Sequence, residues 1–120
     1  MFNKDTYEKI KRLNFEDFLC IIFIIISILN ISANNIQKKY VQTKKEELFK
    51  KSNKIFEITI TITLIIYIYY FIRNISAYNK SNNKEDYMIK LLGSSFMIAG
   101  VLCILYFQNK NETFIGSPTI

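Results

Sequence analysis

Residues 18–29 read FLCIIFIIISIL, twelve positions without a charged side chain. Ten of the twelve are Ile, Leu or Phe, and each such residue contributes about −0.3 to −0.6 kcal/mol to membrane insertion. Their sum, several kcal/mol, exceeds the unfavourable contribution of Asn30, so the apolar run continues less strongly to residue 36. The stretch therefore predicts a membrane-spanning helix over residues 17–36.

Two further apolar runs follow at residues 55–72 and 91–107. Ile and Thr alternate at 58–63, a period of two that taken alone favours a β-strand. Eighteen residues would extend about 59 Å as a strand, but about 27 Å as a helix, close to the bilayer core of about 30 Å. A lone strand would also leave its backbone groups unpaired in lipid. The runs therefore predict membrane-spanning helices over residues 55–73 and 89–108.

The charged residues are segregated from the apolar runs, apart from Arg73 at the end of the second. They lie in four blocks, at residues 4–17, 38–57, 80–90 and 110–112. A soluble protein would spread its charges along amphipathic elements, whereas this segregation is typical of multi-pass membrane proteins. We therefore predict an all-α membrane protein, a single integral domain over residues 1–120 with three transmembrane helices in a small bundle.

Helix starts can be predicted from short polar patterns before the runs. Asn14 stands three residues before Asp17 and predicts the start of the first helix. Thr43-Lys-Lys-Glu46 is a capping-box pattern, which predicts that the second helix begins near Lys44. Asn83 stands three residues before Asp86 and predicts the start of the third helix in the same way. The N-terminal stretch 5–12 can form a short interfacial helix of its own.

A cleaved signal peptide is the rival interpretation of the first run, with Ile31-Ser32-Ala33 as its cleavage site. The preceding segment of 17 residues carries four acidic side chains, which disfavours this alternative. The two cysteines, Cys20 and Cys103, stand inside apolar runs, so no disulfide framework or zinc site is expected. Acylation of Cys20 is the minor alternative to a buried thiol.

Polar residues inside the first two runs are the candidates for contacts between helices, because they share helical faces. Their interpretation is side-chain hydrogen bonding between helices, with a polar path for a solute as the alternative. These intramembrane polar residues are Ser27, Asn30 and Asn34 in the first run, and Thr59 and Thr63 in the second.

Residues at the two ends of the second run are expected at the membrane interfaces. Glu57 stands near its start and is interpreted as an interfacial anchor, with a functional carboxylate as the alternative. Tyr67, Tyr69 and Tyr70 stand at the other end beside Arg73, as in the aromatic belts of membrane proteins.

Small residues lie on two sides of the third run. Gly93 and Gly100 are seven positions apart, and Ser95, Ala99 and Cys103 follow one another at four-residue spacing. Such faces let helix backbones approach closely. We therefore expect the third helix to pack between the other two, with self-association of two copies as the alternative use of one face.

Nothing in the sequence suggests catalysis. It has no His, no Ser or Cys next to a base, no Gly-rich phosphate loop and no carboxylate pair at membrane depth. We therefore predict a protein that is not an enzyme and takes no cofactor or metal. The Lys residues in segment 38–54 are expected to contact lipid headgroups rather than nucleic acid.

The orientation rests on the basic residues of the connecting segments. Eight lie in the N-terminal tail and second loop together, and eight in the first loop and C-terminal tail. The densest block, seven Lys at 38–54, flanks the first helix and favours a cytoplasmic first loop. The expected arrangement in the cell membrane has the N-terminus outside and the C-terminus inside.

The third run and the tail carry a resemblance to known proteins. The segments IKLLGSS (89–95), IAGV (98–101), YFQ (106–108) and FIGSP (114–118) resemble uncharacterised small multi-pass membrane proteins of clostridia and related low-GC Gram-positive bacteria. The resemblance extends over the helical part of the chain. It implies three spans and a bacterial cell-membrane location, and it implies no activity or functional residue.

These observations favour a non-enzymatic membrane protein that acts through helix–helix association, as an accessory subunit or a homo-oligomer. Its partners would be the lipid bilayer and another membrane protein or a second copy. Three alternatives remain: an immunity-type protein against a membrane-active peptide, a holin-like pore former, and a minimal transporter subunit. A holin-like protein would be expected to have a strongly basic C-terminal tail, but Lys110 is the one basic residue after Gln108.

Overall fold

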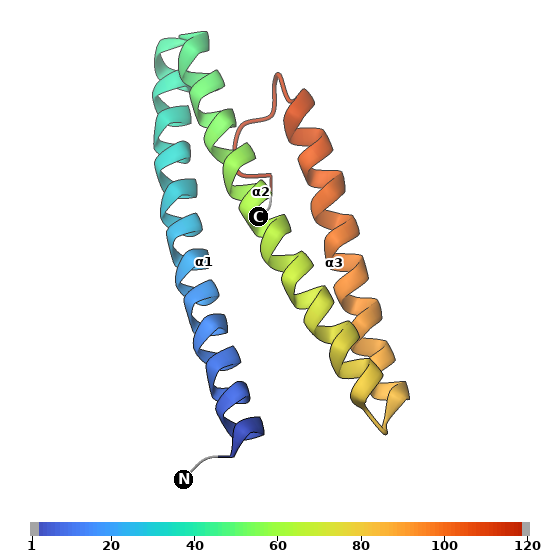
Figure 1. The fold of residues 1–120 in the computed structure, drawn as a ribbon. Coiled ribbons are helices and arrows are strands. Elements are labelled where there is room, and N and C mark those ends of the chain that lie inside the picture. The colour runs from blue at the N-terminus through green and yellow to red at the C-terminus, as the bar shows by residue number, and fades with distance from the viewer. Residues whose placement is uncertain (1–2, 119–120) are drawn as a thin grey trace.

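The computed structural model describes residues 3–118 as three long helices and a short C-terminal segment. The helices α1 (Lys4–Thr43), α2 (Glu46–Lys80) and α3 (Lys84–Lys110) form two consecutive antiparallel hairpins (Figure 1). No strand occurs within residues 3–118. Each helix is long and apolar enough to cross a membrane. The predicted all-α fold with three such helices is confirmed, and each predicted span lies within one helix.

The helices are longer than the membrane core. The 40 residues of α1 extend about 60 Å at about 1.5 Å per residue, which matches the longest dimension of the molecule, 60 Å. A bilayer core is about 30 Å thick. In a bilayer, both ends of the hairpins would therefore project beyond the hydrocarbon region, where charged side chains can contact headgroups and water.

The N-terminal residues belong to α1 rather than to a separate interfacial helix. The Asn3 side chain caps the helix by accepting a hydrogen bond from the backbone N–H of Thr6 at 2.7 Å. Residues 5–12 are its first turns, and no break separates them from the apolar run. The separate helix suggested by the sequence is therefore wrong, because the polar stretch continues the helix that the apolar run requires.

The turn between α1 and α2 consists of Lys44 and Lys45. Lys44 adopts a left-handed conformation with φ 61°, and its N–H donates to the Tyr40 carbonyl at 2.7 Å. The predicted capping box is wrong, because Thr43 ends α1 and its hydroxyl donates to the Lys39 carbonyl at 2.8 Å. The start of the helix was placed within two residues.

The start of α3 agrees with the sequence pattern. Asn83 is its N-cap residue, and its side-chain amide donates to Asp86 Oδ2 at 2.7 Å. Asn83 makes no side-chain bond to the helix backbone. The pattern therefore predicts the first residue of α3 correctly. The Asn83 side chain, however, binds the Asp86 carboxylate rather than a backbone N–H of the helix.

Helix α2, not α3, lies in the middle. It lies against α1 on one side and α3 on the other, whereas within the described residues no Cα atom of α1 comes within 8 Å of one of α3 (Figure 1). The three helices form a flat layer with extents of 60 × 32 × 15 Å. The expected central position of α3 is therefore wrong. Short turns make successive helices antiparallel neighbours, so the second of three packs against both others.

The interface between α1 and α2 follows a heptad pattern. On both helices the buried or half-buried positions alternate at three- and four-residue spacing, as in the seam of a left-handed coiled coil. Leu19 and Ile26 of α1 meet Ile66 of α2 in the apolar part of this seam. The seam positions are Glu16, Leu19, Phe23, Ile26, Asn30, Ala33, Gln37 and Tyr40 on α1, and Phe49, Ser52, Phe56, Thr59, Thr63, Ile66, Tyr70 and Arg73 on α2.

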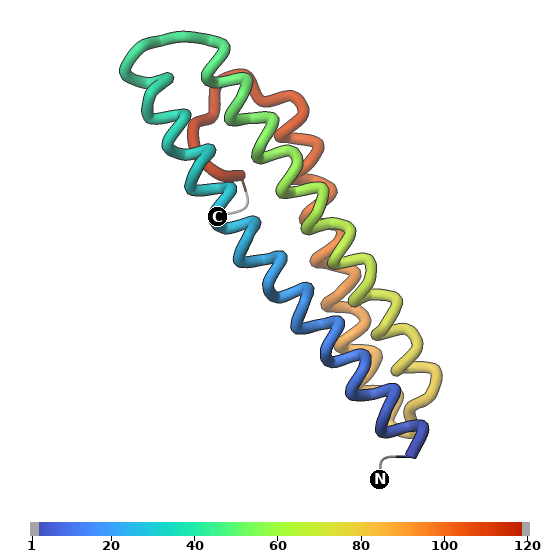
Figure 2. The backbone as a smooth tube through the Cα atoms, turned by 60° about the vertical axis from the view of Figure 1, so that its left-hand side comes forward, coloured from blue at the N-terminus to red at the C-terminus, as the bar shows by residue number. Residues whose placement is uncertain are grey.

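The segment after α3 turns back along the molecule and lies beside α1 and α2 at the end that carries the first turn (Figure 2). Asn111 begins this return, and its side-chain oxygen accepts hydrogen bonds from the N–H groups of Thr113 and Phe114. Further along, Gly116 has φ 118°, a conformation that glycine adopts without steric cost. The return connects the end of α3 to α1, which the helices themselves do not do.

Candidate functional site

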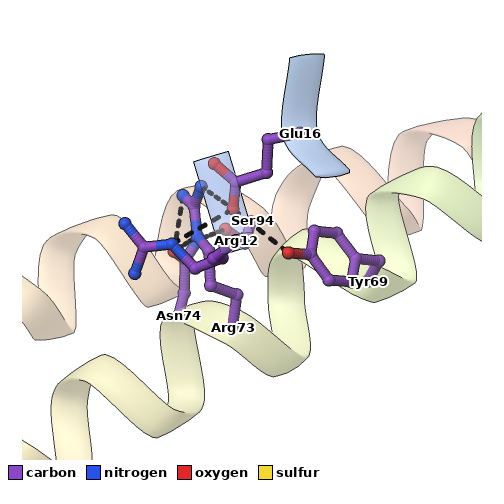
Figure 3. Close-up of polar contacts among 6 residues, drawn as sticks. All are labelled: Arg12, Glu16, Tyr69, Arg73, Asn74 and Ser94. Atoms are coloured by element: carbon purple, nitrogen blue, oxygen red, sulfur yellow. Dashed lines mark hydrogen bonds and ion pairs between the residues drawn. The ribbon is translucent and has the colours of Figure 1, made fainter. Parts of the chain in front are cut away.

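Polar side chains gather in three layers between the helices, and the first is centred on Glu16 (Figure 3). Glu16 Oε2 accepts hydrogen bonds from Arg73 Nη1 and from the Tyr69 hydroxyl, each at 3.1 Å. Arg12 Nε of the same helix lies 3.6 Å from the same oxygen. The Glu16 side chain is only 13% exposed, and the cations and the hydroxyl compensate its burial.

The first layer extends from α1 across α2 to α3. Arg73 Nε and Nη2 donate to Asn74 Oδ1 at 3.3 and 3.0 Å, and Asn74 Nδ2 donates to the Ser94 hydroxyl (Figure 3). The Ser94 hydroxyl in turn donates to the Lys90 carbonyl at 3.2 Å. One chain of polar contacts therefore connects all three helices at a single level. Arg73 stands at the end of the second predicted span, so this level corresponds to one end of the predicted membrane-spanning segments.

The second layer joins α1 to α2 within the predicted spans, 14 residues from the first layer and nearer to the first turn. The Thr59 hydroxyl lies 3.1 Å from Asn30 Oδ1 and 2.9 Å from the Phe56 carbonyl, so its single proton is shared between two acceptors. Asn30 and Thr59 are both buried. Such bonds between transmembrane helices contribute about 0.6 kcal/mol on average.

The third layer lies at the opposite end of the predicted spans, next to the first turn. The buried side chain of Gln37 accepts a hydrogen bond from the backbone N–H of Gly116 at 2.7 Å. Gln108 Nε2 donates to the Asn53 carbonyl at 3.2 Å, and Asn53 Nδ2 donates to the Asn111 carbonyl at 3.3 Å. These contacts hold the C-terminal segment on α1 and the end of α3 on α2.

The structure places the other intramembrane polar residues outside these layers. Ser27 is exposed, and its hydroxyl donates to the Phe23 carbonyl of its own helix. Asn34 is half-buried. The Thr63 hydroxyl donates to the Thr59 carbonyl at 2.9 Å, again within its own helix. Of the five predicted positions, only Asn30 and Thr59 form a hydrogen bond between helices among the described residues.

The interfacial residues divide in a similar way. Glu57 is exposed on α2, where it lines an open hollow with Asn53 and Gln108. Tyr69 and Arg73 both contact Glu16. Two of the residues expected at the interface, Tyr69 and Arg73, therefore belong to the first layer.

The other two tyrosines of the belt also lie in the part of the chain that faces α1. The Tyr70 ring lies under the Arg73 guanidinium, 4.7 Å from ring centroid to Cζ. Tyr67 pairs with the ring of Phe23 at 6.3 Å. Both rings are half-buried, so they pack between helices rather than lying wholly in the headgroup region.

The small residues of α3 do not form a packing face within the chain. Gly93, Ala99, Gly100 and Cys103 are exposed, and Ser95 is half-buried. A Cβ atom added at either glycine would meet no atom within 4 Å. The expected close helix approach at these positions is therefore wrong within one copy of the chain.

Other residues form the actual contact of α3 with α2. The buried or half-buried positions of α3 repeat at three- and four-residue spacing along one side of the helix, and that side faces α2. They include Leu91, Ser94, Ile98, Val101, Leu105 and Gln108.

Sequence reasoning missed several residues of the layers. They are Arg12, Glu16, Asn74 and Ser94 in the first layer and Gln37, Asn53 and Gln108 in the third. Glu16 stands in a block of charges just before the first apolar run, where it suggests nothing beyond a polar flank. A signal existed nevertheless: Glu16 and Arg73 stand at the ends of two runs that a short first loop makes antiparallel, so the two charges meet at one level.

The layers position charges and hydrogen-bonding groups but offer no reactive constellation. The Glu16 carboxylate is held by two cations and a hydroxyl, so it is a positioned counter-ion rather than a free base. Residues 3–118 contain no group of three or more Cys, Asp or Glu side chains that could hold a metal ion. The arrangement holds helices together and leaves charge at one interface.

Comparison of the chain with protein-family models, curated proteins and solved structures finds no match.

Proposed function

We propose that the protein is a non-enzymatic multi-pass membrane protein that acts through helix–helix association, using the outer side of α3. It would work as a homo-oligomer or as an accessory subunit of a larger membrane complex. The observation that carries this proposal is the uncovered state of α3. Only Val101 and Gln108 of this helix are buried, although the helix is apolar enough to cross a membrane.

The outer side of α3 has the pattern of a second packing seam. Exposed positions alternate at three- and four-residue spacing along the side turned away from α2, with glycines at two of them. Small residues let transmembrane backbones approach closely, and van der Waals packing then supplies the drive for association that lipid does not. These positions are Gly93, Phe96, Gly100, Cys103 and Phe107, of which Gly93 lies at the edge of this side and also lines a hollow toward α1.

The native cysteines make this proposal testable without introduced probes. Cys103 stands on the outer seam of α3, and Cys20 is exposed on α1, away from that seam. A disulfide requires the two Cα atoms to approach within about 7 Å. Cys103 can therefore report a contact between two α3 helices, while Cys20 reports random collision in the membrane.

The experiment is oxidative crosslinking of the full-length protein in native membranes. The Cys20→Ser variant, which keeps Cys103, should form a disulfide-linked dimer, and the Cys103→Ser variant should not. Adding Gly100→Leu to the first variant should reduce the dimer, because a bulky side chain separates the backbones. Absence of the Cys103 dimer, or equal dimer from both cysteines, would overturn self-association through α3.

We also propose the orientation with the N-terminus outside and the C-terminus in the cytoplasm. Seven Lys residues at 38–54 support it, because basic residues near the ends of transmembrane helices are retained in the cytoplasm. The end of the molecule with the first turn, the third polar layer and the C-terminal segment would then face inward. The Glu16 layer would lie at the outer interface.

A further inference from the structure

A cleft lies between α1 and α3, with α2 as its floor, because the backbones of the two outer helices do not approach each other closely. It has a volume of about 720 Å³, within the range of about 300–1,000 Å³ typical of small-molecule sites. Arg73 and Lys90 supply its charged part, and Phe23, Tyr70 and Met97 supply rings and apolar surface. Gly93 also lines it, and no atom fills the space where its Cβ would stand.

The cleft contains cationic groups with unused hydrogen-bonding capacity. The Lys90 ammonium has no hydrogen-bond or ion-pair partner among residues 3–118. The Arg73 guanidinium has five N–H donors, three of which bind Glu16 and Asn74. Two Arg73 donors therefore remain available, together with the three of Lys90, and the side chain of Arg73 is still 21% exposed.

The charge at this level favours an anion. Three cations, Arg12, Arg73 and Lys90, stand here on the three helices, against the carboxylates of Glu16 and the adjacent Asp17. Glu16 is already shared by both arginines. The local excess of positive charge is therefore carried mainly by Lys90 and by the free edge of Arg73.

The vertical order of the lining residues separates a polar end from an apolar end. Arg73 and Lys90 stand where the second predicted span ends and the third begins, so both lie at the same membrane interface. Met97 lies seven residues deeper than Lys90, and Phe23 seven residues deeper than Glu16, which is about 10 Å along a helix. An occupant with a charged head and an apolar tail fits this order, whereas a soluble anion would leave the deeper part empty.

We propose that this cleft binds an anionic glycerophospholipid. The phosphate group lies between Lys90 and Arg73, and an acyl chain runs past Gly93 along Phe23 and Met97. The proposal goes beyond association through α3 and does not depend on it, since the lipid site is formed within one copy. The headgroup chemistry is that of a phosphate diester, and the membrane position assigns it to a lipid rather than to free phosphate.

Quenching of a single tryptophan tests this site, because the natural chain contains none. The Phe23→Trp variant is reconstituted in phosphatidylcholine vesicles that contain phosphatidylglycerol, with brominated acyl chains on one lipid at a time. Brominated phosphatidylglycerol should quench more strongly than brominated phosphatidylcholine at equal mole fraction. The Met97→Trp variant probes the same cleft from α3 and serves where the first variant does not fold.

Three matched controls give the result its meaning. Ile28→Trp stands on the exposed surface of α1, outside the cleft and away from the outer side of α3, and should show no preference between the lipids. Adding Lys90→Gln should lower the preference at the cleft about fivefold, the effect of one basic side chain at an anionic surface. Lys80→Gln removes the same charge near the same interface, outside the cleft, and should leave the preference unchanged.

Several results would overturn the proposal. These are equal quenching of the cleft tryptophan by the two lipids, an equal preference at Ile28→Trp, or equal losses with Lys90→Gln and Lys80→Gln. Displacement of the brominated lipid by millimolar inorganic phosphate would contradict the lipid assignment, because a headgroup held with its acyl chain should resist a free anion. The cysteine crosslinking described above has an independent outcome, so failure of either proposal can be told from failure of the other.

Discussion

Glu16 Oε2 lies 3.1 Å from Arg73 Nη1. The two residues are separated by the same number of sequence positions from the turn that joins their helices. Glu16 precedes Lys44 by 28 positions, and Arg73 follows Lys45 by 28. Asn30 and Thr59, the second pair, each stand 14 positions from the same turn. Both distances are whole heptads, so the polar pairs recur on the seam that α1 and α2 share.

The Glu16–Arg73 ion pair is predicted to stabilise the α1–α2 hairpin more than the Glu16–Arg12 ion pair does. A double-mutant cycle with Glu16→Ala and Arg73→Ala should give a coupling of about 1.5–3 kcal/mol, as for hydrogen bonds to charged groups. The measurement is resistance to unfolding in mild detergent titrated with a denaturing surfactant.

Arg12 provides the matched comparison, because it lies 3.6 Å from the same Glu16 oxygen but is 49% exposed. The Glu16→Ala and Arg12→Ala cycle should give about 0.2–1 kcal/mol, as for exposed ion pairs. A coupling with Arg12 equal to that with Arg73 would mean that Glu16 does not join the two helices.

The Asn30–Thr59 contact is predicted to contribute less. Thr59→Val removes the hydroxyl while keeping the shape, and it should reduce stability by about 0.6–1.7 kcal/mol in the same titration. Thr63→Val is the control, since the Thr63 hydroxyl binds only its own helix backbone, and its effect should be close to zero. Equal effects of the two substitutions would show that the Asn30 contact contributes nothing.

The left-handed conformation of Lys44 predicts that glycine is preferred there. An L-residue at φ 61° is disfavoured by roughly 1–2 kcal/mol, so Lys44→Gly should leave the hairpin equally stable or more stable. Lys45, with φ −82°, provides the control, and Lys45→Gly should destabilise because it adds only backbone freedom in the unfolded chain. The opposite order in the detergent titration would contradict the turn geometry.

The three helices could be predicted from the sequence, because the length of each apolar run distinguishes a membrane-spanning helix from a strand. The alternating Ile and Thr of 58–63 favour a strand locally, yet this segment lies within α2, as the need to pair every backbone group in lipid requires. Helix ends were less predictable. The predicted start of the first helix at Asn14 is wrong: Asn3 caps α1 and Asn14 lies inside it, because nothing in the polar stretch 5–12 interrupts a helix.

The packing of α3 was not predictable from its small residues. Gly100 and Cys103 mark a surface suited to close approach, but a pattern on one helix does not say which neighbour it meets. Turn length carried more information: two short connections place α2 between its neighbours, and they bring Glu16 level with Arg73. Counting outward from the turn at Lys44 would have found that pair.

The orientation predicts the behaviour of a reporter at the C-terminus. A fusion after residue 120 should be active when the reporter functions only in the cytoplasm, because the seven Lys of 38–54 hold the first turn on that side. An export-dependent reporter at the same position should be inactive. Activity of the export-dependent fusion alone would reverse the orientation and place the Glu16 layer at the inner interface.

The arrangement of three helices with α2 in the middle is tested most directly by paired cysteines in a background that carries Cys20→Ser and Cys103→Ser. Asn30→Cys with Thr59→Cys, and Asn74→Cys with Ser94→Cys, replace side chains that are hydrogen-bonded across helices. Both pairs should form disulfides rapidly when intact membranes are oxidised. Phe23→Cys with Met97→Cys, on opposite walls of the cleft between α1 and α3, should not. Crosslinking of this last pair as fast as the other two would contradict the open layer and bring α1 and α3 into contact.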